Sequence, residues 1–213
     1  MKVLAAVLQG TQAPQGRYLY GDRPVKEPVI QTLGDPSKPD ALITRNSYGA
    51  LCLNTEDVAF VDVDNGDLNR VRSAQGSHPD WALRVYRTKA GLRVVAVHAR
   101  MSPRSSQAAE LFNALGADPM YVKLCAMQES FRARLTPKPW RIDLRRMPGA
   151  FPWRDQSMER RVNDWVAEYD SERKGFAVCE LAGVFGTPSG DEAIERILNL
   201  HDHWVLAAGK PLA

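Results

Sequence analysis

The chain has 213 residues, of which 44% are hydrophobic and 25% are charged, and its formal net charge is +3. These proportions are ordinary for a globular protein with a hydrophobic core, and three widely spaced cysteines exclude a disulfide framework or a zinc-binding spacing. No apolar run is long enough for a signal-peptide core or a membrane span. We therefore expect a single cytoplasmic domain over residues 1–213, with no membrane partner.

The first quarter of the chain predicts strands around an irregular segment. Residues 1–10 are expected to form a buried strand, and residues 10–40 are rich in Gly, Pro and Gln and predict an irregular lead-in. Two further strands are expected at residues 41–46 (ALITRN) and 57–64 (DVAFVDVD).

A β-hairpin is expected next, because residues 82–87 and 92–98 flank the turn T-K-A-G and carry β-branched residues on both arms. A four-residue loop places Tyr86 opposite Arg93. Arg84, Tyr86 and Arg93 then share one face, and the apolar residues of the opposite face are expected to carry the helices. The polar face is a candidate phosphate-binding surface, or simply an open, solvated sheet face.

Helix signals dominate the second half of the chain. Ser102 and Asp118 each precede a proline and predict side-chain N-caps, and the first of these two helices is expected to end at Gly116. A third helix has one apolar face, formed by Met158, Val162, Trp165, Val166 and Tyr169. A buried strand over 176–185 and a last helix opened by a capping box at 189–192 follow. The order predicts an α+β fold, with a largely antiparallel sheet, a central hairpin and helices on one face.

The sharpest local signal is the segment FVDVD. Side chains alternate along a strand, so Asp62 and Asp64 point to the same side. Two neighbouring carboxylates repel each other unless a cation lies between them, and Mg²⁺ or Mn²⁺ accepts such oxygen ligands. The pair is therefore a candidate metal site, and a solvated strand end before a turn is the alternative.

The basic excess of the chain lies in one segment, FRARLTPKPWRIDLRR, residues 131–146. It contains a single acid, Asp143, and six cations: Arg132, Arg134, Lys138, Arg141, Arg145 and Arg146. Because Arg binds phosphate through two parallel hydrogen bonds, we expect the segment to contact a phosphate group, with Phe131 and Trp140 as stacking surfaces for a base. The alternative is that Trp140 lies in the core and that the cations pair with helix acids such as Glu110, Glu129 and Glu159.

The order of these motifs resembles the archaeo-eukaryotic primase superfamily, particularly its small prim-pol domains. That family has a strand ending in D-x-D, here FVDVD, then a hairpin, here YRTKAGLRVVAVH, then a strand with a third acid, here Asp143 in KPWRIDLR. The resemblance covers residues 41–150, and residues 151–213 would complete the domain with a helix, a strand and a helix. Arg93 stands where the family has its nucleotide-binding histidine.

The resemblance implies an RRM-like, primase-like core in which Asp62, Asp64 and Asp143 act as catalytic acids with Mg²⁺ or Mn²⁺. Nucleotide phosphates would be held by basic residues, and Tyr86 and Trp140 would complete the site; the basic residues are Arg84, Arg93, Arg132, Arg134, Lys138 and Arg141. Asp143 has an alternative role as a salt-bridge partner of the arginines beside it.

Three functions therefore stay open. The first is an enzyme for metal-dependent nucleotidyl or phosphoryl transfer. The second is a non-catalytic module that binds a nucleotide or a single-stranded nucleic acid through Arg and aromatic residues. The third is a protein that uses its basic segment to bind an acidic protein partner. The sequence does not indicate an oligomeric state.

Overall fold

The computed structural model describes residues 15–20, 23–35 and 38–213, so the strand expected at residues 1–10 lies outside the described residues. The fold is α+β, as predicted, but the strands form two antiparallel sheets instead of one. Every helix in the described ranges is too short or too polar to cross a bilayer.

The first sheet has the strand order β1-β2-β3-β4-β8. Its strands are β1 (Gln15–Tyr20), β2 (Arg23–Asp35), β3 (Lys38–Arg45), β4 (Leu51–Thr55) and β8 (Phe131–Arg134). The prediction of an irregular lead-in up to residue 40 is therefore wrong for β1 and β2. The strand β2 contains Gly and Pro, and its pairing with β3 shifts register at two places. One of these shifts is at Gly34, whose φ of 86° favours glycine.

The second sheet has the order β5-β7-β6-β9. Its strands are β5 (Phe60–Asp64), β7 (Gly91–Ala96), β6 (Leu83–Thr88) and β9 (Cys179–Phe185). The predicted hairpin register is confirmed, because Tyr86 lies opposite Arg93. The strand β9 is an edge strand, and Leu181 and Val184 are about half exposed, so the expectation of a fully buried strand there is wrong.

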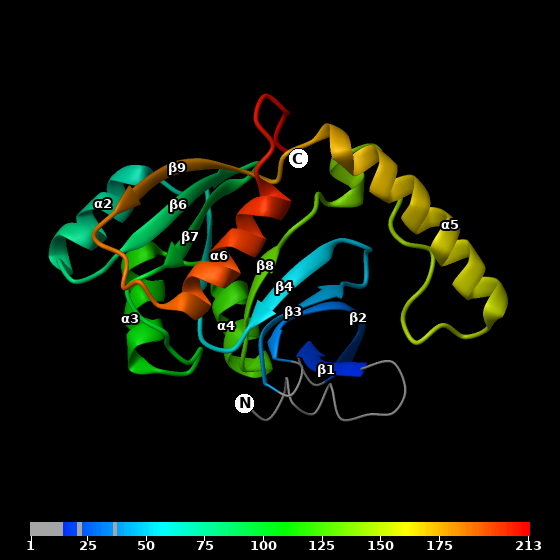
Figure 1. The fold of residues 1–213 in the computed structure, drawn as a ribbon, viewed down its shortest axis with the longest axis horizontal. Coiled ribbons are helices and arrows are strands. Elements are labelled where there is room, and N and C mark those ends of the chain that lie inside the picture. Colours follow the sequence, from blue (N-terminus) through cyan, green and yellow to red (C-terminus); the bar gives the residue numbers. More distant parts are fainter. Residues whose placement is uncertain (1–14, 21–22, 36–37) are drawn as a thin grey trace.

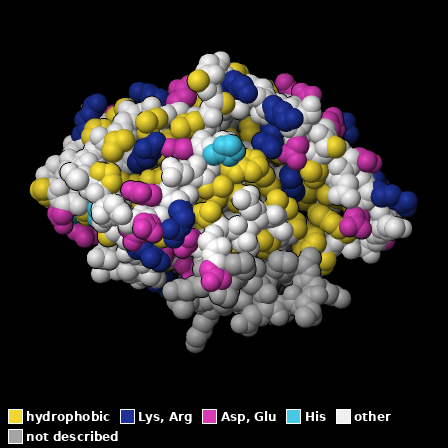
Figure 2. Space-filling model, in the orientation of Figure 1, with side chains coloured by type: hydrophobic (Ala, Val, Ile, Leu, Met, Phe, Trp, Pro, Cys, Tyr) yellow, Lys and Arg dark blue, Asp and Glu magenta, His cyan; other side chains and the backbone are white. Residues whose placement is uncertain are grey.

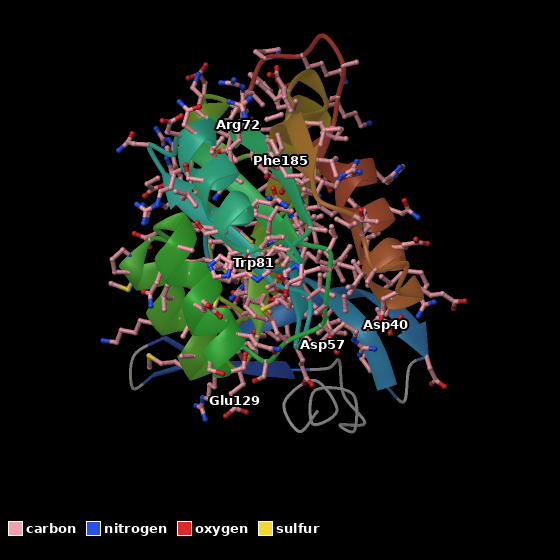
Figure 3. The ribbon with its side chains drawn as sticks, turned by 90° about the vertical axis from the view of Figure 1, so that its left-hand side faces the viewer. Asp40, Asp57, Arg72, Trp81, Glu129 and Phe185 are labelled. Carbon is pink, nitrogen blue, oxygen red and sulfur yellow. The ribbon has the colours of Figure 1, made fainter. Side chains whose placement is uncertain are left out.

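The helices lie on both sides of the second sheet. They are α2 (Leu68–Ser77), α3 (Ser106–Leu115), α4 (Pro119–Gln128), α5 (Gln156–Glu172) and α6 (Glu192–Val205), with short 3₁₀ turns η1 (Pro139–Arg141) and η2 (Arg173–Gly175). Seen along the sheet edge, α2 and α3 lie on one side and α6 on the other (Figure 3). The expectation that helices back only one face is therefore wrong, and the helix α2 was not predicted.

The helix ends follow the capping residues closely. Asp118 caps α4 by accepting a hydrogen bond from the Tyr121 N–H at 2.7 Å, with Pro119 at the first helical position, as predicted. Helix α3 also ends at Gly116 as predicted, but it is capped by Ser105 instead of Ser102. Residues 103–104 form a turn before it.

One hydrophobic core joins both sheets and most helices. It includes Leu53 of the first sheet, Phe60 and Val94 of the second, Phe112 of α3 and Ile197 of α6. A smaller cluster packs the predicted apolar face of α5 against the loop that follows η1. In Figure 1, α5 extends away from the sheets on the right and α6 lies across the front of them.

Helix α6 also links the two sheets through polar contacts. Arg196 of α6 donates to Asp40 of β3 at 3.0 Å, and Asp40 lies beside α6 in Figure 3. Asp202 of the same helix accepts hydrogen bonds from Arg84 and Tyr86 of β6, each at 2.5 Å. The helix therefore holds the first and second sheets in a fixed relation.

Candidate functional site

The candidate site begins at Asp62 on β5. Antiparallel pairing of β5 with β7 places Asp62 opposite Arg93 and Asp64 opposite Gly91. The Arg93 Nε donates to Asp62 Oδ1 at 3.1 Å. The Arg93 side chain is 1% exposed, whereas that of Asp62 is 36% exposed, so one partner is buried and the other reaches the surface. Asp62 and Arg93 therefore form an ion pair between neighbouring strands.

The guanidinium of Arg93 also contacts the first sheet. Its Nη1 donates to the backbone oxygen of Arg134 on β8 at 2.8 Å. Burial lowers the pKa of Arg93, but the Asp62 carboxylate more than offsets this effect and the pKa lies above its usual value. Arg93 is therefore a permanently charged connector between the two sheets.

A buried polar network lies behind Arg93. The Arg93 Nη1 lies 3.4 Å from Nε2 of His201, and His201 Nδ1 lies 3.0 Å from Oδ1 of Asp202. Burial lowers the pKa of His201 to about 4, so the ring is neutral at pH 7. With a carboxylate beside Nδ1 and a guanidinium beside Nε2, the neutral ring carries its proton on Nδ1.

Arg84 and Tyr86 belong to this network and not to the cation-lined surface that was expected. Arg84 donates to the Tyr86 hydroxyl at 2.7 Å, and both residues donate to Asp202. Tyr86 is fully buried. The predicted face of Arg84, Tyr86 and Arg93 exists, but α6 covers it, so the prediction that Arg84 and Tyr86 contact phosphate is wrong.

A cavity of about 230 Å³ opens beside Asp62 and Asp64, and we call it the first cavity. It lies between the β5–β7 edge, the start of α4 and the segment that follows β8. Its walls are formed by Asp62, Asp64, Thr88, Ala90, Leu92, Arg93, Asp118, Met120, Tyr121, Leu124, Arg134, Lys138 and Arg141. The fold thus brings three of the six cations of the basic segment to the acid pair, across a sequence separation of about 70 residues.

Three cations of the basic segment, Arg134, Lys138 and Arg141, line the first cavity together with the acids. Burial, together with Arg134 and Arg141, lowers the pKa of Lys138, and burial and Arg134 lower the pKa of Arg141. The three positive charges therefore repel one another in a partly buried environment. Among the described residues, Arg134 Nε and Arg141 Nη1 are buried without a hydrogen-bond partner. Such donors are rare in folded proteins and mark a place where a ligand or water is expected.

Arg132 is held differently. Its Nη2 donates to Oε2 of Glu27 at 2.7 Å, and the Thr44 hydroxyl donates to the same oxygen at 2.5 Å. The Glu27 side chain is 3% exposed. The predicted phosphate contact of Arg132 is therefore replaced by a buried ion pair with a strand acid. Two of the helix acids proposed as alternatives contact residues outside the basic segment. Glu129, which is labelled in Figure 3, pairs with Arg104, and Glu110 lies near His78.

The two aromatic residues of the segment have opposite environments. Phe131 is fully buried in the core, so its expected stacking role is wrong. Trp140 is 43% exposed. Its ring lies 5.1 Å from that of Tyr48, and the Arg146 guanidinium lies 4.8 Å from the Trp140 ring centroid. Trp140 is therefore available at the surface, beside the residues that line the first cavity.

Asp143 does not join the acid pair. It follows η1 in a turn, not on a strand, with a left-handed φ of 60°. It is exposed, and it lines neither the first cavity nor the larger cavity between α4 and the first sheet. In the described part of the chain it makes no ion pair with Arg141 or Arg145 either. The structure thus separates Asp143 from Asp62 and Asp64.

The residues present suit only an open metal site. No group of three or more His, Cys, Asp or Glu side chains among the described residues is arranged to hold a metal ion. Asp62 shares one oxygen with Arg93, and Asp64 is exposed at the strand end. Mg²⁺ is commonly held by one or two carboxylates together with substrate phosphates. Asp62 and Asp64 fit that arrangement and do not form an all-protein cage.

Sequence reasoning missed Tyr121 and Asp118 as parts of the site. The Tyr121 hydroxyl donates to the backbone oxygen of Phe60 at 2.6 Å, and the Asp118 N–H donates to that of Asp62 at 3.1 Å. These bonds fix the start of α4 against β5. The Asp-Pro pair was recognised as a helix start, but no local signal indicates that this helix would pack on the acid strand.

Charges of both signs are interspersed on the face shown in Figure 2, and apolar side chains gather there between α6 and α5. The basic excess is not displayed as a single patch on that face. No protein-family model matches the chain, and no curated protein and no solved structure is significantly similar to it.

Proposed function

We propose that the first cavity binds the phosphate groups of a nucleotide. The observation that carries this proposal is the pair of buried guanidinium donors, Arg134 Nε and Arg141 Nη1, without a partner among the described residues. Both residues line the cavity that contains Asp62 and Asp64. A phosphate group supplies several acceptor oxygens and negative charge, and it would relieve the repulsion among Arg134, Lys138 and Arg141.

The acid pair in the same cavity favours a polyphosphate with a divalent cation over a simple anion. Asp62 and Asp64 would hold Mg²⁺ or Mn²⁺, with phosphate oxygens completing the coordination. When bound, the cation would neutralise charge on the phosphate oxygens, which is the contribution that metal ions make to phosphoryl and nucleotidyl transfer. The chain's own residues would bind and orient the phosphates.

The other two functions have less support. A binding site for an acidic protein would need exposed cations, but four of the six cations of the basic segment are partly buried and only Arg145 and Arg146 are exposed. Single-stranded nucleic acid binding is favoured by one observation, the exposed Trp140 with Arg146 over its ring. That surface adjoins the first cavity, so a nucleic-acid strand and a nucleotide phosphate would use neighbouring parts of the same site.

The proposal is tested by measuring the melting temperature with Mn²⁺ alone, a nucleoside triphosphate alone and both together. A ligand that binds only the folded state raises the melting temperature. At a free concentration of 100 times its Kd, such a ligand raises the free energy of unfolding by about 2.7 kcal/mol. We expect the largest shift with both ligands. Arg141→Gln and Lys138→Gln should reduce it, while Arg160→Gln, an exposed α5 residue outside the cavity, should not.

The metal contribution is tested with Asp64→Asn, because Asp64 is exposed and its loss leaves Arg93 paired. The gain from Mn²⁺ should disappear in this variant and persist in Asp80→Asn, which alters an exposed acid outside the cavity. The proposal fails when no nucleotide shifts the melting temperature, or when Arg160→Gln lowers the shift as much as Arg141→Gln does.

A further inference from the structure

A second cavity of about 490 Å³ adjoins the first. It lies between α4 and the face of the first sheet that carries Cys52 and Arg132. Four residues line both cavities, namely Asp62, Tyr121, Leu124 and Arg134. Because the two spaces share these walls, they lie directly beside each other. The volume of the second cavity lies in the range of small-molecule pockets.

The second cavity differs chemically from the first. Its walls include the rings of Tyr48 and Tyr121, the side chain of Leu124 and the thiols of Cys52 and Cys125. Burial raises the pKa of Cys52 and raises that of Cys125 to about 12, so both thiols are neutral at pH 7. These side chains form a neutral, largely apolar surface, in contrast to the charged walls of the first cavity.

Apart from Asp62 and Arg134, which also line the first cavity, the charged residues of the second cavity neutralise each other. Glu27 and Arg132 form the ion pair at 2.7 Å described above, and both line the second cavity. The amide of Gln128, which is 4% exposed, also lies in the wall. The cavity thus offers aromatic and apolar faces with a few polar groups at the edges, which is the usual composition of a site for a flat heteroaromatic ring.

We propose that the second cavity receives the base of a free mononucleotide whose phosphates lie in the first cavity. This inference rests on the proposed function and adds the substrate class to it. A mononucleotide has a polyanionic end and a flat, uncharged end. The first cavity, with its cations, complements the phosphates, and the second cavity, with its aromatic and apolar walls, complements the base. The sugar would pass the shared residues Asp62 and Arg134. An alkyl chain would fill the apolar space but would use neither the tyrosine rings nor the polar edges.

The position of the base has a mechanistic consequence. In template-directed synthesis, the pairing edge of the incoming base faces the template strand. A base between α4 and the first sheet would instead contact side chains that line the second cavity, among them Tyr48, Leu124 and Gln128. We therefore expect the nucleotide to bind without a template strand.

The experiment compares ligands on the unaltered protein by isothermal titration calorimetry with Mn²⁺. The ligands are inorganic tripolyphosphate, purine and pyrimidine nucleoside triphosphates, and dodecyl phosphate. We expect at least one nucleoside triphosphate to bind tenfold or more tightly than tripolyphosphate, with no gain when a complementary single-stranded oligonucleotide is added. A template-dependent gain, or tighter binding of dodecyl phosphate, would overturn the inference.

A blocking variant tests the location. Ser47 is exposed and lines the second cavity, so Ser47→Trp places a ring at its rim without altering the core. This change should lower nucleoside triphosphate affinity to that of tripolyphosphate and leave tripolyphosphate affinity unchanged, while the matched Ser47→Ala changes neither. Equal affinity for both ligands, unaffected by Ser47→Trp, would refute the base site and leave the phosphate site intact. Binding of neither ligand would refute the proposed function itself.

Discussion

Arg93 and Asp62 lie opposite each other on β7 and β5 and are joined by a hydrogen-bonded ion pair of 3.1 Å, with the guanidinium buried and the carboxylate partly exposed. This asymmetry decides what each substitution does. Removing the carboxylate leaves a buried positive charge, whereas the neighbouring Asp64 is exposed at the strand end.

The first prediction concerns stability at this pair. Asp62→Asn should lower the free energy of unfolding by about 2–3 kcal/mol, because a buried guanidinium loses its counter-charge. Asp64→Asn should change it by less than about 0.5 kcal/mol, as expected for an exposed strand end. Urea unfolding at pH 7 measures both values, and equal effects of the two substitutions would contradict the geometry.

Gly91 is required where β7 begins opposite Asp64. A Cβ at this position would lie 2.1 Å from the backbone oxygen of Val63. Gly91→Ala should therefore cost about 2 kcal/mol or more, since backbone atoms must move, and it should weaken nucleotide binding by displacing Asp64. Gly76 lies on α2, and a Cβ added there would have no neighbour within 4 Å. Gly76→Ala should therefore raise the free energy of unfolding by about 0.5–1 kcal/mol. Thermal unfolding distinguishes the two outcomes.

His201 predicts a specific loss of stability in mild acid. The unfolded chain takes up a proton near pH 6.5, whereas burial delays protonation of the folded protein to about pH 4. The free energy of unfolding should therefore be fully retained above pH 6.5 and fall as the pH drops towards 4, by on the order of 3 kcal/mol.

His201→Gln tests this dependence, because glutamine has no proton to take up in that range. Its unfolding free energy should vary less between pH 6.5 and 4.5 than that of the unaltered protein. Asp202 also contributes, but at lower pH: burial raises its pKa, hydrogen bonds from His201, Tyr86 and Arg84 more than offset this, and the pKa lies below its usual value. An identical slope for the variant would show that other groups cause the loss.

Tyr169 links α5 to the basic segment. Its hydroxyl donates to the backbone oxygen of Pro137 at 2.6 Å and lies 2.8 Å from the Thr136 hydroxyl. Tyr169→Phe leaves these buried groups without this partner and should cost about 1–2 kcal/mol. Because Lys138 follows directly, nucleotide affinity should fall as well. Glu168→Gln, an exposed neighbour on α5, should change neither quantity in the same titration.

The sequence predicted local features well and long-range pairing poorly. The four-residue loop after Arg87 fixed the hairpin register, and strand alternation fixed the common side of Asp62 and Asp64, since both depend only on neighbouring residues. The contact of Asp62 with Arg93 depends on β5 pairing with β7, which no local pattern specifies.

The failures have identifiable physical causes. The strands β1 and β2 were missed because Gly and Pro normally interrupt strands, whereas here β2 bends at register shifts. Helix α2 was missed because only Val71 and Ala74 are buried on it, too few for a clear helical period. Arg84 and Tyr86 were assigned to a ligand surface because the position of α6 over their sheet face could not be read from the sequence.

The contact between Arg93 and His201 spans 108 positions of the chain. During synthesis on the ribosome, β5 and β7 emerge long before α6, the helix that packs behind Arg93. Packing of α6 against the buried guanidinium is therefore expected to be a late folding event.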